Sequence, residues 1–308
     1  MSHHLADTVL MVRPAAFGYN EQTAADNSFQ KLLPGISLKE LQKKALKEFN
    51  AMVEQLRKRS IEVLVFDDTS LPVKTDALFP NNWFNTMPNG NLSVFPMLAI
   101  SRRLEKRDDI LQQLTIQFEV KGFTDWSELE AEGLFLEGTG SMVIDHDNKI
   151  IYACLSQRTH YTALEKFAHY NQYKAIAFHA TDENGKSIYH TNVMLTIGND
   201  FAVICKECFT DELEWIAVSQ LLRTTGHKIL TISQQQVNAF AGNMLQVKNN
   251  KGESFLVMSQ TAFDSLSINQ RMLLEISCTL LPVNIPTIET LGGGSARCMM
   301  AEIFLKKK

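Results

Sequence analysis

Residues 141–178 read SMVIDHDNKIIYACLSQRTHYTALEKFAHYNQYKAIAF, and this stretch contains the unit from which the fold is built. Two apolar runs flank the polar tip Asp145-His146-Asp147-Asn148, which predicts a β-hairpin over residues 141–155. Apolar residues then recur at three- to four-residue spacing over residues 161–171, which indicates an amphipathic helix. Residues 173–178 predict a returning strand. The unit is therefore hairpin, helix and strand.

The same unit recurs along the chain. Other hairpins are predicted over residues 83–97, 193–205 and 244–258, helices over residues 38–58, 107–118, 211–225 and 265–275, and returning strands over residues 61–66 and 227–232. A fifth unit begins at Gly292 and forms the end of the chain. The hairpins start at intervals of about 51–58 residues, near Asn82, Gly140, Asn192, Asn243 and Ala296. Five similar units predict a closed ring in which each unit covers its neighbour, and hence one domain over residues 1–308.

Composition restricts the class of partner. The chain has 308 residues, 45% of them hydrophobic, and a formal net charge of -4. Charges of both signs are spread evenly, so nucleic acid is not an expected partner and a small molecule is. No apolar run approaches the roughly 20 residues that span a bilayer, and the first seven residues lack a signal-peptide pattern. We expect a cytoplasmic protein without a membrane partner, and the composition leaves a homo-oligomer open.

Cysteine usage draws attention to the end of the chain. Cys298 follows Gly292-Gly293-Gly294-Ser295-Ala296-Arg297, where glycines allow close approach to a ligand and an arginine favours thiolate. A nucleophile and a buried small hydrophobe remain equal interpretations of this segment alone. Cys205 and Cys208 have the spacing of half a zinc site, but no second pair follows, so packing is favoured. An odd total of five cysteines argues against a disulfide framework.

Unusual polar residues gather where the hairpins start. In a ring these positions converge on the axis, and they include Asn82, Glu137, His190 and Cys298. A cysteine, a histidine and a carboxylate supply a nucleophile, an acid/base and a group that orients the imidazole. Each residue also has a structural interpretation: Glu137 as a surface charge, His190 as a core histidine, and Arg158 as an ion pair at a helix start.

Together these segments resemble motifs of the arginine deiminase and amidinotransferase superfamily, often called penteins. Glu137-Gly138 looks like the start of its Glu-Gly-Gly-Asp motif, and His190-Thr191-Asn192 looks like its His-x-Asp. Ser156-Gln157-Arg158-Thr159 is similar to its Ser-x-Arg-Thr, and Phe79-Pro80-Asn81-Asn82 stands where it has Phe-x-Arg-Asp. Cys298 matches the terminal nucleophile. The resemblance covers nearly the whole chain and implies an α/β fold, the five-fold pseudosymmetric α/β propeller.

The resemblance also implies roles. Cys298 would attack a guanidino-type carbon, His190 would move protons, and Glu137 would hold the imidazole. Arg158 would bind the α-carboxylate of an amino-acid substrate, which suits the bidentate geometry of guanidinium. Phe79 and Asn81 are further candidates for substrate contact. Neither a metal nor an organic cofactor is implied.

The chain departs from the family at three acidic positions, which here are Asn82, Asn192 and Gly140. An ionised Asp only accepts hydrogen bonds, whereas an Asn amide accepts and donates, as a neutral ureido group requires. We therefore expect a citrulline hydrolase that releases ornithine, carbon dioxide and ammonia, similar to the citrulline-hydrolase branch. The alternatives are a guanidine-modifying enzyme, either arginine deiminase-like or an amidinotransferase, and a non-catalytic binding protein.

The sequence leaves the roles of one segment and one further residue open. Residues 13–30 have little periodicity and form either a lid, with Arg13 or Asn20 touching substrate, or an ordinary surface loop. Asn243 either faces the axis or serves as a turn residue.

Overall fold

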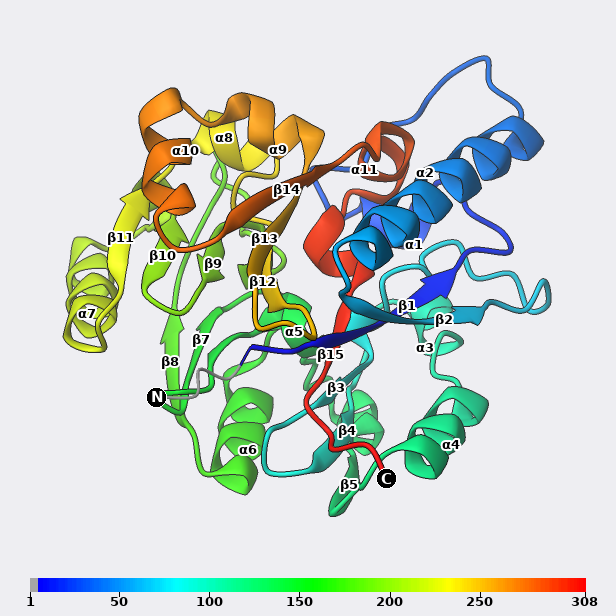
Figure 1. Ribbon diagram of the computed structural model, residues 1–308, viewed down its shortest axis with the longest axis horizontal. Helices are drawn as coiled ribbons and strands as arrows, with labels where there is room; N and C mark the ends of the chain where they lie inside the picture. The colour runs from blue at the N-terminus through cyan, green and yellow to red at the C-terminus, as the bar shows by residue number, and fades with distance from the viewer. Residues whose placement is uncertain (1–4) are drawn as a thin grey trace.

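The computed structural model describes residues 5–308, and within that range it contains five three-stranded sheets (Figure 1). Each of four sheets joins an antiparallel hairpin to a parallel returning strand, as the repeat predicts. Their strands are β3 (Phe84–Thr86), β4 (Asn91–Val94) and β5 (Gly122–Asp125); β6 (Val143–Asp145), β7 (Ile150–Cys154) and β8 (Lys174–Phe178); β9 (Leu195–Ile197), β10 (Phe201–Ile204) and β11 (Lys228–Thr231); and β12 (Leu245–Lys248), β13 (Ser254–Ser259) and β14 (Thr279–Val283).

The fifth sheet is made from both ends of the chain. β1 (Thr8–Arg13) lies between β15 (Ala301–Ile303), with which it is antiparallel, and β2 (Glu62–Asp67), with which it is parallel. The fifth unit, predicted to begin at Gly292, is therefore completed by two strands from the N-terminal region. The three residues of β15 have no following strand and take their partner from the N-terminal region. Five sheets of this kind are consistent with a pseudo-fivefold arrangement.

Helices cover the outside of the sheets (Figure 1). The longer ones are α2 (Leu38–Lys58), α4 (Asp108–Gln117), α6 (Tyr161–Asn171), α7 (Glu212–Thr224) and α10 (Ile268–Glu275). α6 buries Leu164 and Phe167 in one cluster with Ile151 and Ala153 of β7, and each large apolar side chain buried in this way contributes roughly 1.5–3 kcal/mol.

The prediction of one helix over residues 265–275 is wrong at its start. Residues Gln260–Ser265 form a separate helix, α9, and Ser267 then begins α10 through a capping box with Gln270. The side chain of Ser267 accepts from the backbone of Gln270, and that of Gln270 accepts from the backbone of Ser267. These bonds satisfy backbone donors that a helix start leaves free.

Short helical turns lie at the starts of the hairpins. They are η1 (Pro80–Asn82), α5 (Gly138–Ser141), η3 (Thr191–Val193) and η5 (Ala296–Met299). η1 contacts both α5 and η5, and α5 contacts η3. Segments that are far apart in the sequence are therefore adjacent here, and these turns, together with the residues that cap their N-terminal ends, contain most of the predicted site residues.

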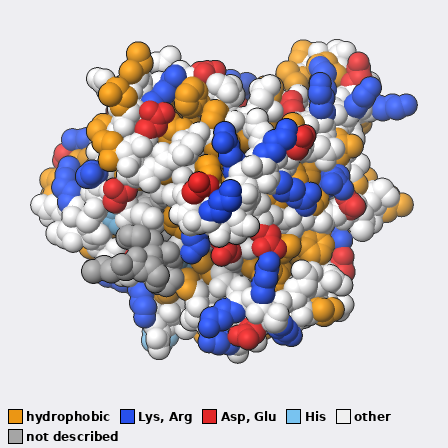
Figure 2. All heavy atoms as spheres, viewed as in Figure 1, with side chains coloured by type: hydrophobic (Ala, Val, Ile, Leu, Met, Phe, Trp, Pro, Cys, Tyr) orange, Lys and Arg blue, Asp and Glu red, His pale blue; other side chains and the backbone are white. Residues whose placement is uncertain are grey.

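Among residues 5–308, no helix combines the length and apolar character needed to cross a bilayer. On the face drawn in Figure 2, Lys and Arg side chains are scattered with acidic side chains between them.

Candidate active site

Cys298 lies in η5 at the edge of a narrow cavity of about 10 Å³. Its side chain is 3% exposed. Four other predicted residues also line this cavity: Phe79, Asn82, Arg158 and His190. The remaining side chains in the lining were not predicted: Thr23, Asn27, Asp76, Arg102 and Tyr189. The sequence motifs therefore meet in one place.

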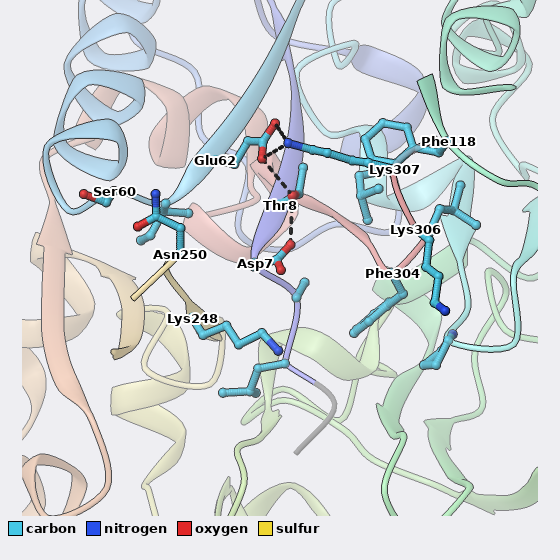
Figure 3. A pocket seen from close by; sticks show the side chains of 16 residues that line it. Asp7, Thr8, Ser60, Glu62, Phe118, Lys248, Asn250, Phe304, Lys306 and Lys307 are labelled. Atoms are coloured by element: carbon cyan, nitrogen blue, oxygen red, sulfur yellow. Dashed lines mark hydrogen bonds and ion pairs between the residues drawn. The ribbon is translucent and has the colours of Figure 1, made fainter. Parts of the chain in front are cut away.

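A wider groove lies elsewhere and has a different lining (Figure 3). Lys248, Lys306 and Lys307 contribute to it, and Lys307 is paired with Glu62. None of the predicted site residues lines this groove, so it is not the candidate site.

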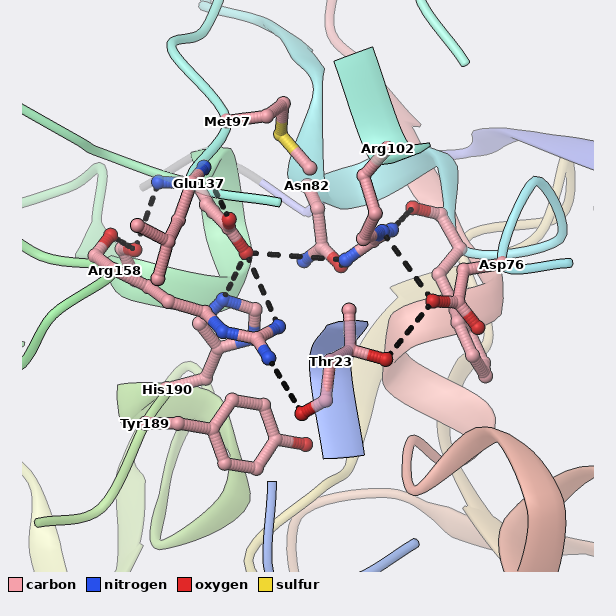
Figure 4. A network of polar contacts seen from close by, with 12 residues as sticks. Thr23, Asp76, Asn82, Met97, Arg102, Glu137, Arg158, Tyr189 and His190 are labelled. Carbon is pink, nitrogen blue, oxygen red and sulfur yellow. Dashed lines mark hydrogen bonds and ion pairs between the residues drawn. The ribbon is translucent and has the colours of Figure 1, made fainter. Parts of the chain in front are cut away.

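His190 and Glu137 form a buried pair beside the cavity (Figure 4). Nε2 of His190 lies 2.8 Å from Oε2 of Glu137, and Oε1 of Glu137 accepts from the backbone N–H of Leu98 at 3.0 Å. Since an ionised carboxylate only accepts, Nε2 carries the hydrogen and Nδ1 remains the basic nitrogen. The pair has the geometry of an oriented acid/base.

Electrostatics set the charge of this pair. Burial alone would raise the pKa of Glu137, but Arg158, the hydrogen bond from His190 and Arg102 outweigh it and lower that pKa to about 2. Burial lowers the pKa of His190 below 6.5, and Glu137 opposes part of this shift. At neutral pH the pair therefore consists of a carboxylate and a neutral imidazole that can take a proton.

Gly140 keeps two site residues close together. A Cβ atom at this position would lie 2.3 Å from Nδ2 of Asn82 and 2.7 Å from Nδ1 of His190. No side chain fits there unless the amide or the imidazole moves. The absence of the family's acidic residue at this position thus has a steric reason in this chain.

Carboxamides surround the sulfur of Cys298. Nδ2 of Asn192 lies 3.5 Å from Sγ, and Nδ2 of Asn243 lies 3.3 Å from it. Asn243 thus faces the axis, which resolves the alternative left open by the sequence. In Asn82, Oδ1 accepts from Nη1 of Arg102 at 2.8 Å. Within the described range, Nδ2 of Asn82 and Oδ1 of Asn192 have no hydrogen-bond partner, so one donor and one acceptor remain free.

Arg102 of α3 (Ile100–Arg103) is the centre of a charged cluster that sequence reasoning missed (Figure 4). It donates twice to Glu105, at 2.9 Å each, and lies 3.8 Å from both Glu137 and Asp76. Burial raises the pKa of Glu105 to about 7 although Arg102 opposes the shift, and burial also raises the pKa of Asp76. One signal was available: Arg102 follows the first hairpin much as Arg158 follows the second.

Arg158 already holds a carboxylate in this structure. Its Nε donates to Asp26 at 2.6 Å, its Nη2 donates to Asp26 and to the carbonyl of Thr23, and its Nη1 lies 3.5 Å from Glu137. The ring of Tyr189 lies below the guanidinium at 5.0 Å. The predicted carboxylate-binding side chain is therefore occupied by an internal carboxylate from the N-terminal segment.

That segment covers the cavity. It contains the short helix α1 (Glu21–Ala24), whose N-cap Asn20 donates to Asp76 at 2.8 Å. Asn27 and Gln30 donate to the carbonyls of Gly293 and Leu291. Of the two interpretations of residues 13–30, the structure favours a cover over the site.

Three predicted substrate-contact residues, Arg13, Asn81 and Asn192, are not among the side chains that line the cavity. Arg13 does not line the cavity: as the last residue of β1 it points outward, 36% exposed, to Asp67 at 2.5 Å and Asn50 at 3.1 Å. Asn81 is buried outside the cavity lining, because successive residues of a 3₁₀ turn point in different directions.

The loss of the three acidic residues of the family does not leave the cavity without an acidic side chain. The three motif positions lack an acidic side chain, but Asp76 lines the cavity from the loop that leads into the Phe79 motif. Its Oδ2 accepts from Asn20, and within residues 5–308 its Oδ1 has no hydrogen-bond partner. A carboxyl group is thus present next to Arg102.

The five cysteines are free thiols and all are buried. Cys205 and Cys208 lie in a large apolar cluster with their sulfurs 3.0 Å apart, which agrees with packing. No group of three or more His, Cys, Asp or Glu side chains in the described part of the chain is arranged to hold a metal ion.

The five small sheets are consistent with the pseudo-fivefold arrangement of a pentein, and Cys298, His190 and Glu137 come together at one place in it. Residues 13–305 match the family model described as N,N dimethylarginine dimethylhydrolase, eukaryotic, and the chain belongs to this family. It is thus homologous to C–N bond hydrolases of the pentein superfamily. No curated protein matches the chain.

Solved structures share the fold. The N-terminal domain of ArgZ, covalently bound to a reaction intermediate, is 16% identical, with a TM-score of 0.73 over 96% of this chain and 97% of that one. Whole apo ArgZ, an arginine dihydrolase from the ornithine-ammonia cycle in Cyanobacteria, is 14% identical with a TM-score of 0.74, and the match covers 96% of this chain and 40% of that one. A variant of DDAH from Pseudomonas aeruginosa in complex with citrulline is 12% identical, with a TM-score of 0.65 over 97% and 100% of the chains.

Proposed function

We propose that this protein hydrolyses the ureido group of citrulline to give ornithine, carbon dioxide and ammonia. Cys298 is the nucleophile in this proposal, His190 transfers protons, and Glu137 holds the imidazole. Small amino acids of this kind are also the ligands of relatives, because DDAH from Pseudomonas aeruginosa was solved with citrulline.

The orientation of two amides supports the ureido substrate most directly. Arg102 only donates, so Oδ1 of Asn82 must face it, which leaves Nδ2 of this cavity-lining residue without a hydrogen-bond partner among the described residues. Asn192 lies behind the sulfur and does not line the cavity, but it turns Nδ2 to the sulfur, which leaves its Oδ1 without a partner among the described residues. A ureido group offers a carbonyl acceptor to the first amide and N–H donors to the second. A guanidinium has no acceptor for Asn82, and a buried donor without a partner costs about 1–3 kcal/mol.

The first half of the reaction forms a covalent intermediate. The thiol proton passes to Nδ1 of His190, Sγ of Cys298 bonds to the ureido carbon, and the carbonyl electron pair moves to oxygen. Nδ2 of Asn82 stabilises that oxyanion, a contribution of roughly 10²- to 10³-fold in rate. The bond from carbon to the ornithine nitrogen then breaks, and this nitrogen takes the proton from His190. A carbamoyl thioester remains.

The second half uses water. His190 removes a proton from a water molecule, whose oxygen attacks the thioester carbon, and the C–S bond breaks to restore the thiolate. The proton held by His190 returns to the sulfur. The released carbamate decomposes to carbon dioxide and ammonia. Glu137 stabilises the imidazolium in both halves, because it stays ionised with a pKa of about 2.

The other end of the substrate is assigned to the charged side of the cavity. In the structure, Arg158 binds the carboxylate of Asp26 through both Nε and Nη2. In this proposal the α-carboxylate of citrulline replaces Asp26 when it binds. Phe79 contributes apolar surface to the same cavity.

A guanidine hydrolase is the second candidate, and two observations favour it. The matched family is described as acting on N,N-dimethylarginine, and Asp76 offers an acidic side chain inside the cavity. Asp76, however, lies 3.8 Å from Arg102 and accepts from Asn20, so its charge is already opposed. The carboxamides, by contrast, contact the sulfur itself.

We also propose that residues 1–308 form a single catalytic domain. β15 pairs with β1, so the two ends belong to one sheet, which supports a single catalytic domain. A cytoplasmic location fits five free cysteines, because reducing compartments keep thiols reduced.

The test compares substrates and charge at Asn82. Purified protein is assayed for ornithine and ammonia from citrulline, and for products from arginine and N,N-dimethylarginine. We expect citrulline to be the preferred substrate. Asn82→Asp replaces the free donor by an acceptor, so citrulline turnover falls about 10²- to 10³-fold.

Asn89→Asp is the matched control, because Asn89 is exposed at the tip of the same hairpin and should keep full activity. Arginine or dimethylarginine turned over as well as citrulline would favour the second candidate. Absence of turnover with all three substrates would favour a binding protein.

A further inference from the structure

Asn243 is fully buried where the third and fourth hairpins start. It lies in the loop between α8 (Gln234–Asn238) and β12, and it is 0% exposed. The residue before it is Gly242, where a Cβ atom would lie only 2.3 Å from the carbonyl oxygen of Val193. The glycine therefore lets the fourth hairpin start approach the third closely.

The amide of Asn243 has a single orientation. Its Nδ2 donates to the carbonyl oxygen of Asn192 at 2.9 Å, and its Oδ1 accepts from the backbone N–H of Arg297 at 3.1 Å. A carbonyl cannot donate and a backbone N–H cannot accept, so a flipped amide would lose both bonds. In this orientation Nδ2 lies 3.3 Å from Sγ of Cys298, and Oδ1, which can accept from the thiol, lies farther away at 3.7 Å. An N–H group is thus held next to the sulfur by two backbone contacts.

We propose that Asn243 is a positioning residue for the nucleophile, which holds the Cys298 thiolate through its N–H group. The proposal rests on Cys298 being the nucleophile, as in the proposed function. Burial disfavours a charged sulfur, and hydrogen bonds to the charged form offset that penalty. Asn192 supplies a second N–H at 3.5 Å. Asn243 links the backbone beside Asn192 to the backbone beside Cys298, so one carboxamide sets the geometry of both.

The placement also predicts how kinetics respond. Asn243 contacts the sulfur but is not among the side chains that line the cavity. Its loss should therefore lower kcat while KM stays within about twofold, since ground-state binding is not touched. A cavity residue such as Asn82 should change both.

The test measures the sulfur without any substrate. Alkylation of Cys298 by iodoacetamide is followed by peptide mass spectrometry across a pH series, in the wild type and in Asn243→Asp. The variant loses the donor and adds a negative charge beside the thiolate. We expect alkylation at neutral pH to slow about 10- to 100-fold, the effect of losing a hydrogen bond to a charged group. The midpoint of the profile should move to higher pH.

Asn238→Asp is the control, because it makes the same change five positions earlier, on the exposed surface of α8. Asn243→Ala is the second variant and should shift the profile in the same direction by a smaller amount. Circular dichroism reports whether each variant is folded. A folded Asn243→Asp with the wild-type pH profile would overturn the proposal. If neither variant folds, Asn243 is a structural link and the proposal is also overturned.

Because iodoacetamide replaces the substrate, this result does not depend on citrulline. Failure of citrulline turnover with a shifted profile would reject the proposed function and keep the role of Asn243. The reverse pattern would reject the role of Asn243 alone.

Discussion

The two sides of the cavity contain different kinds of polar side chain. Around Cys298 the polar contacts are carboxamides, with Asn192 and Asn243 at 3.5 and 3.3 Å from the sulfur. Around Arg102 they are carboxylates, with Glu105 at 2.9 Å and both Asp76 and Glu137 at 3.8 Å. Asn82 joins the two sides, because it lines the cavity and its oxygen accepts from Arg102 while its nitrogen has no partner among the described residues.

The difference shows where charge is tolerated. Buried charges persist when opposite charges and hydrogen bonds compensate them, and the side at Arg102 and Arg158 provides both. The side at the sulfur offers only dipoles. A ligand with a charged amino-acid end and an uncharged reacting end matches this division.

The largest expected effect tests the carboxamide side. Cys298→Ser should reduce citrulline turnover about 10⁴-fold or more, because the nucleophile is lost. Steady-state assays of ornithine release measure this. Cys278→Ser serves as the control, since Cys278 is buried away from the cavity. Similar turnover by the two variants would place the nucleophile elsewhere.

The next effect tests the charged side through Glu137. Glu137→Gln should lower kcat about 10²- to 10⁴-fold, because the imidazolium of His190 loses its counter-charge. The pH profile has a defined sign. Burial lowers the pKa of His190 and Glu137 raises it, so removing Glu137 lowers it further. The acid limb of kcat/KM should then move to lower pH.

A pH-rate series on wild type and variant checks this, and an acid limb that moves to higher pH contradicts it. The pH dependence of folding stability provides a second test of the role of Glu137. Since the folded-state pKa of Glu137 is about 2, its contribution is complete above 4.5 and is lost as the pH falls toward 2. Glu137→Gln should therefore lack this part of the acid sensitivity in thermal melts.

The smallest effect concerns the internal carboxylate. Asp26→Asn should lower KM for citrulline severalfold, up to about tenfold, with kcat nearly unchanged, because a charged competitor for Arg158 is removed. Steady-state kinetics measure the change, and Glu21→Gln on the exposed surface of α1 is the control. A higher KM would mean that Asp26 assists binding instead of competing with it.

The repeat made most secondary structure predictable. α2 and α6 have the predicted bounds, and the four central hairpins lie where their tips indicate. The break between α9 and α10 was missed because apolar spacing continues across it, while the stop depends on the cap at Ser267. The closing pair of β1 and β15 was missed because a local pattern does not specify a partner some 290 residues away.

The site was predictable where motifs carried it. Cys298, His190, Asn82 and Arg158 line one cavity, and Glu137 contacts His190. Arg102, Asp76 and Asp26 were missed, because none of them is part of a recognised motif. Arg13 and Asn81 lie outside the cavity lining, since proximity in sequence to other site residues does not fix the direction of a side chain.

The sequence by itself determined the elements, their fivefold repetition and the residue types brought to the axis, because periodicity and turn chemistry act over a few residues. Only the tertiary structure decided which atoms of those residues face the cavity. The amide of Asn82 is oriented by Arg102, that of Asn243 by the backbone of Arg297 and Asn192, and Arg158 is occupied by Asp26. Each of these partners comes from another segment, and a hydrogen bond has a direction that composition and spacing do not encode.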